Sequence, residues 1–310
     1  MINFIGFDNI INNFYLRAEK NTLSHAHLIV GPEGIGKSIL ARIFALKILN
    51  KDKDLNYIDI INYRPEKATF GVDEARKIIE EVSKKAFEGD KKVIIIHKAN
   101  TLTVQAQNAL LKTIEDPPYG VFFIILCENL ELMLETIRSR CQIYKLTPLN
   151  KEEMLRFIET LNITDQNKKV TALAYAEGVP GRAVQILEDE KLMQLRDIIR
   201  QSLIELRTNK NYIVDYETKL DNYKDRKNEV LDTYTSLIRD IIIYKELTKK
   251  ELIINIDMID AICEISEQIS YKKLNLLLKN VEEARINLLS NINYSMVIST
   301  MLIEFLEEYA

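Results

Sequence analysis

The stretch "HAHLIVGPEGIGKS", residues 25–38, decides the fold of this chain. It begins as a short apolar run that predicts a strand ending at Gly31. Its second half, Gly31–Ser38, fits the phosphate-loop pattern G-x-x-x-x-G-K-[ST]. Residues 37–49 follow with apolar positions at helical spacing. Strand, glycine-rich loop and helix in this order are the context that the pattern requires, so we predict a phosphate-binding loop.

The loop supplies most of the candidate ligand residues. Glycines allow its backbone to curl with the N–H groups inward, and the start of the helix adds positive charge. Lys37 is expected to reach the β- and γ-phosphates, and Ser38 to bind Mg²⁺. We therefore predict that ATP or ADP binds here, with Mg²⁺ through Ser38; a glycine-rich turn without a ligand is the alternative. The predicted nucleotide-binding residues of the loop are Gly31, Gly34, Gly36, Lys37 and Ser38.

Further apolar runs alternate with helical patterns through the first half of the chain. The predicted strands are residues 25–31, 57–61, 92–96, 121–126 and 142–146. The helices predicted between them are residues 37–49, 72–87 and 104–116. This alternation predicts a parallel sheet covered by helices on both faces. The run 92–96 has almost no polar alternation, so we expect an interior strand. From Lys151 to Ala310 the pattern predicts helices alone.

Composition limits the kinds of protein that this chain resembles. A net charge of −4 argues against a protein that coats nucleic acid by itself. The three cysteines have no C-x-x-C spacing, so we expect neither a disulfide scaffold nor a zinc site, and no metal-ligating cluster is assigned. The first residues lack a positive leader and no run of 18 apolar residues exists. These features predict a reduced, cytoplasmic protein without a membrane segment.

The strand predicted at residues 92–96 ends in His97 and Lys98, where a hydrolysing phosphate-loop protein carries acidic residues. A histidine is a poor partner for Mg²⁺, which prefers hard oxygen ligands. A lysine does not act as a base toward water near neutral pH. The sequence therefore favours loss of ATP hydrolysis, unless Glu33 or Asp116 supplies the missing carboxylate.

Other charged and polar residues are weaker candidates. His25 and His27 could share one strand face and form a metal site, although polar residues at a strand edge are the preferred interpretation. Arg138 and Arg140 precede the last predicted strand, and Arg182 is either directed at the loop or a surface residue near a helix start. A DNA-facing surface in an assembly, with a solvated face as the alternative, would use Gln105, Gln107, Asn108, Lys112, Lys84, Lys85, Lys91 and Lys92.

Several motifs in order identify a resemblance to a known family. They are "HAHLIVGPEGIGKS", "VDEARKI", "QAQNALLKTIEDPP", "FFIILCEN" and "TIRSRC", and they cover about residues 1–185. In these motifs the chain resembles clamp-loader subunits of the AAA+ class, and more narrowly the delta-prime subunits of bacterial DNA polymerase III. The helical remainder resembles that family only in kind.

The resemblance implies an α/β phosphate-loop AAA+ domain, an all-α lid and an all-α collar, which we place at residues 1–148, 149–207 and 208–310. It implies that Arg140 serves the ATP of a neighbouring subunit, and that Asn129 senses phosphate. The family's second sensor arginine falls at Gly181, and its four-cysteine zinc module is absent. The implied partners are other clamp-loader subunits in a hetero-oligomeric ring, the sliding clamp and primer–template DNA. Two alternatives stay open: an active AAA+ ATPase, either a loader motor or a solitary remodeller, and a phosphate-loop kinase for small molecules.

Overall fold

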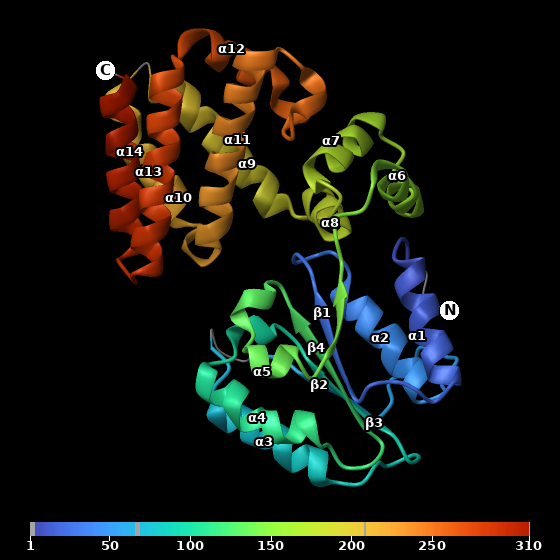
Figure 1. Ribbon diagram of the computed structural model, residues 1–310. Helices are drawn as coiled ribbons and strands as arrows, with labels where there is room; N and C mark the ends of the chain where they lie inside the picture. Colours follow the sequence, from blue (N-terminus) through green and yellow to red (C-terminus); the bar gives the residue numbers. More distant parts are fainter. Residues whose placement is uncertain (1–3, 66–68, 208, 310) are drawn as a thin grey trace. The chain divides into compact units, whose positions relative to one another are not determined.

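The computed structural model describes residues 4–65, 69–207 and 209–309 (Figure 1). The chain forms two compact units, Met1–Thr160 with Gly178–Gly181, and Leu161–Glu177 with Arg182–Ala310. The finer division into three domains at residues 148 and 207 stays a prediction.

The first unit contains a five-stranded parallel sheet in the order β2-β3-β4-β1-β5. Its strands are β1 (Ala26–Val30), β2 (Ile60–Tyr63), β3 (Lys92–Ile96), β4 (Val121–Cys127) and β5 (Gln142–Lys145). The predicted parallel α/β sheet is confirmed, and β3 is an interior strand with every residue buried. The strand predicted at residues 57–61 begins late, because Tyr57 and Ile60 close a turn and Asp59 binds the N–H groups of Phe87 and Glu88.

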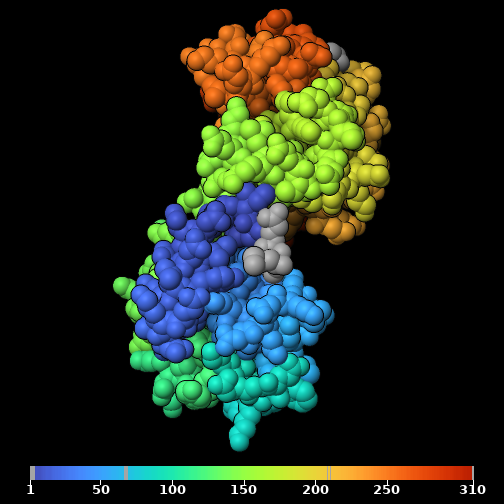
Figure 2. Space-filling view, turned by 90° about the vertical axis from the view of Figure 1, so that its right-hand side faces the viewer, coloured from blue at the N-terminus to red at the C-terminus, as the bar shows by residue number. Residues whose placement is uncertain are grey.

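Helices cover both faces of the sheet (Figure 1). One face packs against α1 (Asp8–Glu19) and α2 (Lys37–Ile48), and α1 also lies at the molecular surface, in dark blue in Figure 2. The other face packs against α3 (Val72–Ser83), α4 (Val104–Glu115) and the short α5 (Glu135–Arg138). The prediction that extended α3 to residue 87 is wrong. Lys92 binds the carbonyls of Glu81 and Lys84 with its ammonium group and so satisfies the helix end at Ser83.

The second half of the chain is helical, as predicted. The α-helices are α6 (Lys151–Thr160), α7 (Gln166–Ala176), α8 (Pro180–Glu188), α9 (Glu190–Glu205), α10 (Ile213–Asp221), α11 (Lys227–Leu247), α12 (Ile259–Gln268), α13 (Tyr271–Leu289) and α14 (Tyr294–Tyr309). Short 3₁₀ helices are η1 (Ala99–Thr101), η2 (Leu130–Leu132), η3 (Lys210–Tyr212), η4 (Lys224–Arg226), η5 (Lys250–Leu252) and η6 (Ile256–Met258). Among the residues that the structure describes, none of the helices combines the length and the apolar composition needed to cross a membrane.

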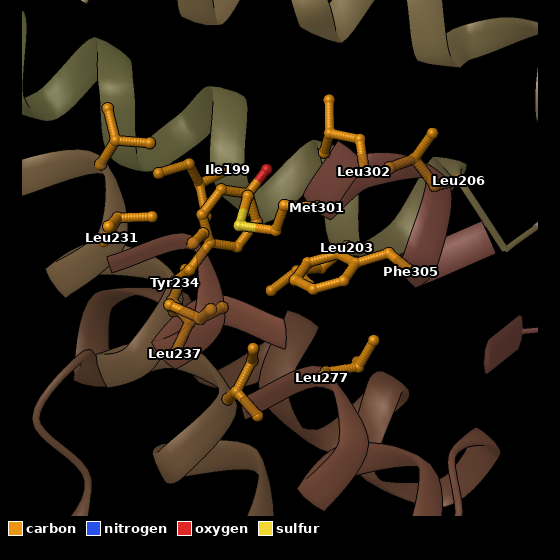
Figure 3. Close-up of a cluster of buried hydrophobic side chains, with 14 of the residues drawn as sticks. Ile199, Leu203, Leu206, Leu231, Tyr234, Leu237, Leu277, Met301, Leu302 and Phe305 are labelled. Carbon is orange, nitrogen blue, oxygen red and sulfur yellow. The ribbon is translucent and has the colours of Figure 1, made fainter. Parts of the chain in front are cut away.

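The core of the second unit is one cluster of buried side chains from α9 to α14 (Figure 3). Tyr234 lies in this cluster with its ring edge toward Phe305, and its hydroxyl is hydrogen-bonded to the hydroxyl of Ser202. A buried tyrosine hydroxyl needs such a partner, because an unpaired polar group in a core costs free energy.

His27 lies fully buried in β1, so the interpretation of a polar residue at a strand edge is wrong for it. Its ring packs edge-on against Phe14 and Phe44, and its Nδ1 lies 3.2 Å from the hydroxyl of Tyr144. The pKa of His27 is lowered to about 4, mainly by burial, with smaller contributions from the nearby charges of His25 and Arg17. The imidazole is therefore neutral in the folded protein near neutral pH.

This burial predicts a pH-dependent stability. The folded-state pKa lies below the unfolded-state value of 6.5, so the free energy of unfolding is highest above pH 6.5 and falls as the pH drops toward 4. We expect a loss of roughly 3 kcal/mol from His27 over this range. Urea unfolding followed by circular dichroism measures it, since the chain has no Trp.

The His27→Leu variant should flatten this slope, because it removes the buried titrating group. Part of the slope will remain, since the pKa of His97 is also lowered. His25→Gln, at a less buried position just before β1, is the control and should leave the slope unchanged. If His27→Leu and the wild-type chain showed the same pH dependence of the free energy of unfolding, His27 would not be its source.

Candidate nucleotide-binding site

The phosphate loop connects the end of β1 to the first turn of α2. Gly34 and Gly36 have φ values of 84° and 106°, a region that suits glycine. A Cβ on Gly36 would lie 2.6 Å from the ring of Phe4, so a side chain there meets both strain and a close neighbour. At the start of the loop, Gly31 donates its N–H to the carbonyl of Cys127 in the adjacent strand β4.

Lys37 binds the loop itself in this structure. Its Nζ donates to the carbonyl oxygens of Gly31 at 2.6 Å and of Pro32 at 2.9 Å. Burial lowers the pKa of Lys37, while the carboxylates of Glu128 and Glu33 act to raise it. The lysine thus lies inside the curl of the loop, where phosphate oxygens would replace the two carbonyl oxygens as its hydrogen-bond acceptors.

His97 follows β3 and is buried between two polar side chains. Its Nε2 lies 2.9 Å from Oδ1 of Asn62, and its Nδ1 lies 3.4 Å from Oγ of Ser38. With Nε2–H donating to Asn62, Nδ1 accepts the hydroxyl hydrogen of Ser38. Burial lowers the pKa of His97 to about 4, helped by the charge of Arg64, so the ring is neutral near pH 7. His97 therefore lies beside the loop, and its neutral imidazole contacts Ser38, the residue predicted to bind Mg²⁺.

Lys98 and Glu33 form an ion pair across the loop, with Nζ and Oε1 3.0 Å apart. Both side chains are largely exposed, so the pair contributes little to stability. Glu33, one alternative source of the missing carboxylate, pairs with this lysine in the structure. Asp116, the other alternative, follows α4 at the edge of the sheet where β4 begins, opposite the loop.

The loop also contacts the backbone at Gly181. The N–H of Gly181 donates to the carbonyl of Gly34 at 2.9 Å, and a Cβ on Gly181 would lie 2.6 Å from the Cα of Gly34. The position expected for a second sensor arginine therefore holds a glycine that lies against the loop. Arg182 forms an ion pair with Glu177 at 2.9 Å.

Asn129 lies just after β4, at the same edge of the sheet as the loop. Its Oδ1 accepts the N–H of Glu131, which makes it the N-cap of η2. Its predicted role as a phosphate sensor stays a prediction. Its neighbour Glu128 is the carboxylate that acts on Lys37.

Arg140 is held by contacts that the sequence did not predict. Its guanidinium binds Glu115 at 3.0 Å and the carbonyl of Thr136 at 2.9 Å. The carboxylate of Glu115 raises the pKa of Arg140, and the arginine in turn lowers the pKa of Glu115. The segment before Arg140 is helical, since Ser139 continues α5 in a helical conformation.

Arg140 lies at the edge of the sheet opposite the loop. β5 is parallel to β1, with Gln142 opposite His27 near the start of both strands. The loop begins at the other end of β1, about 16 Å away for five residues at ~3.3 Å each. Among the described residues Arg138 has no ion pair, and its Nε is buried without a hydrogen bond.

The residues proposed to face DNA divide into two groups. Gln107 is buried and bonds to the backbone of Leu102, Leu132 and Leu134, and Lys92 is buried against Glu81. These two are therefore wrong as surface residues, because their polar groups hold the fold together. Exposed members of the set are Gln105, Asn108, Lys112, Lys84 and Lys85, and Lys91 is half-buried.

Sequence reasoning missed Asn62, Glu115 and the loop contact of Gly181. Asn62 fell outside the strand predicted at residues 57–61, although it lies in β2. Glu115 was visible only as part of a helix pattern, and its partner is 25 residues away. No local signal in the sequence connects either residue to its partner.

Two family models match the chain. One is described as DNA polymerase III, delta subunit, and matches residues 6–150; the other is described as DNA polymerase III, delta subunit, C terminal, and matches residues 190–307.

Curated relatives and solved structures are also similar to this chain. DNA polymerase III subunit delta' of Escherichia coli (strain K12) is 27% identical over 255 residues, which cover 81% of this chain and 74% of the relative. The subunit delta' of Haemophilus influenzae is 29% identical over 197 residues, covering 57% of this chain and 59% of the relative. A crystal structure of a DNA polymerase III gamma subunit-related protein from Thermotoga maritima is 17% identical, with 97% of this chain and 99% of that chain covered and a TM-score of 0.48.

The contact between Gly34 and Gly181 predicts a destabilising substitution. Gly181→Ala places a methyl group against the backbone of the loop, so the free energy of unfolding should fall by about 1–3 kcal/mol. Gly89→Ala is the matched control, because nothing lies within 4 Å of the Cβ that it adds. Urea unfolding is measured for the wild-type chain and the two variants. Equal midpoints for Gly181→Ala and Gly89→Ala would show that the contact between Gly181 and Gly34 tolerates a methyl group.

Proposed function

We propose that this chain, which belongs to the DNA polymerase III delta-prime family, is a clamp-loader subunit that acts on the ATP of a neighbouring subunit without hydrolysing ATP itself. Family membership supports the place in a clamp loader, because the two matching models cover the first and the second half of the chain. The finer role is argued from the residues of this chain.

The observation that carries the proposal is the position of Arg140. It lies at the sheet edge opposite its own loop and next to the start of β5, which supports a role at a site other than the loop of its own chain. Its pairing with Glu115 and the carbonyl of Thr136 holds the side chain in one arrangement. Arginine suits phosphate recognition because its planar guanidinium stays charged and can bind two oxygens at once.

Loss of hydrolysis follows from the residues after β3. His97 is a neutral imidazole in contact with Ser38, and Lys98 is an ammonium group paired with Glu33. Both ring nitrogens of His97 are engaged by Ser38 and Asn62, and Lys98 is protonated near neutral pH, so neither residue is available to activate water. Loss of a general base alone costs about 10²–10⁴ in rate. We propose that ATP or ADP still binds through Lys37 and the loop backbone.

The proposed partners follow from the family. They are other clamp-loader subunits in a hetero-oligomeric ring, the sliding clamp and primer–template DNA, in the cytoplasm. The exposed residues Gln105, Asn108 and Lys112 of α4 are proposed to face DNA only in the assembled ring. A net charge of −4 gives the single chain little long-range attraction for a polyanion.

The first prediction concerns turnover. The isolated chain should bind ADP or ATP but release no measurable phosphate, because the groups after β3 supply no general base. A continuous assay for phosphate release measures this, with Lys37→Ala as the control for loop-dependent activity. Sustained turnover of several per second that disappears in Lys37→Ala would show an active ATPase.

A second prediction concerns Arg140. Arg140→Ala should fold and join its partners, because the side chain is at the surface and its pairing is partly exposed. In the reconstituted assembly, ATP hydrolysis at the one adjacent site should fall by about 10³-fold or more, which is the effect of losing an arginine finger. Clamp loading should fall with it.

Arg76→Ala provides the matched control for this experiment. Arg76 is an exposed arginine of α3 paired with Asp73 in the same unit. Assembly can be checked by gel filtration before hydrolysis and loading are measured. Wild-type loading by an assembly that contains Arg140→Ala would exclude the finger role and leave Arg140 as a structural surface residue.

A further inference from the structure

Ser38 is the residue of the loop expected to bind Mg²⁺, and its surroundings do not suit that ion. Mg²⁺ requires hard oxygen ligands in a near-octahedral arrangement, and carboxylates supply most of its protein contacts. The group beside Ser38 is the imidazole of His97, whose Nδ1 lies 3.4 Å from Oγ. The other ring nitrogen is engaged by Asn62 at 2.9 Å, so the imidazole is fixed in this position.

Charge near the loop is also unfavourable for a divalent cation. Lys37 lies within the loop, Lys98 lies beside it, and Arg64 is near enough to lower the pKa of His97. The carboxylates that act on Lys37 are Glu33, which pairs with Lys98, and Glu128, which follows β4. Neither occupies the end of β3 beside Ser38, which is where a metal-binding carboxylate would lie.

We infer that the loop binds a nucleoside diphosphate or triphosphate as a metal-free anion, and that His97 excludes the divalent cation from Ser38. This inference rests on the proposed binding of nucleotide at the loop. Lys37 and Lys98 supply the positive charge that a metal ion would otherwise give to the phosphates.

Lys98 is free to take this role at little cost. Its ion pair with Glu33 joins two largely exposed side chains, and such a pair is readily exchanged for a contact with phosphate. Lys37 exchanges two carbonyl contacts for charge-assisted bonds to phosphate oxygens, which are stronger. Both exchanges leave the hydroxyl of Ser38 in contact with His97.

Binding of ADP to the full-length chain with and without Mg²⁺ tests the inference. Isothermal titration is carried out in EDTA and in excess Mg²⁺. The wild-type chain should bind ADP more tightly in EDTA, because Mg²⁺ sequesters the free anion. In His97→Asp, which restores a carboxylate, Mg²⁺ should instead tighten binding by about tenfold or more.

The control is His25→Asp, which makes the same substitution near the opposite edge of the sheet and should behave as wild type. If circular dichroism shows that His97→Asp is unfolded, His97→Asn supplies a neutral oxygen in its place and should raise the affinity in Mg²⁺ relative to EDTA. Lys37→Ala should lose binding in both solutions.

Two results would overturn the inference. One is wild-type binding that is about tenfold tighter in Mg²⁺ than in EDTA. The other is absence of ADP binding to the wild-type chain in both solutions. Neither result bears on the role of Arg140, since the titration involves no partner subunit.

Discussion

The parallel hydrogen-bond ladder of β4, β1 and β5 is the constraint on which the rest of the first unit depends. Parallel strands bring their carboxyl ends to one edge of a sheet and their amino ends to the other. The loop, His97 and Asn129 follow β1, β3 and β4, so they lie at the carboxyl edge. Arg140 precedes β5 and therefore lies at the amino edge. One ladder thus separates the candidate nucleotide-binding groups of the chain from its candidate arginine finger.

Much of the fold could be predicted from sequence because its signals are local. Buried parallel strands appear as apolar runs, and the motif Gly31–Ser38 fixes the strand before it and the helix after it. The errors occur where distant residues decide the local structure. Asp59 binds the backbone of Phe87 and Glu88 and delays β2, while Lys92 ends α3 by binding its last carbonyls. Neither contact leaves a pattern that periodicity detects.

The candidate site divides in the same way between local and long-range information. The loop residues could be predicted because the motif lies within a few positions, and His97 could be identified because it ends a recognisable strand. Its contact with Asn62 could not, since the two residues lie on neighbouring strands and 35 positions apart. The burial of His27 was also missed, because a histidine in an apolar run gives no sign that aromatic rings surround it.

The contacts of the loop satisfy its polar groups within the chain itself. Lys37 satisfies two carbonyls that would otherwise face inward, His97 accepts the hydroxyl of Ser38, and Gly181 binds the carbonyl of Gly34. Pairing of these groups meets the requirement that buried backbone polar groups find hydrogen-bond partners. The proposed finger role requires that the guanidinium of Arg140 be presented in a fixed position. The contact between Arg140 and Glu115 at the opposite edge of the sheet supports that proposal.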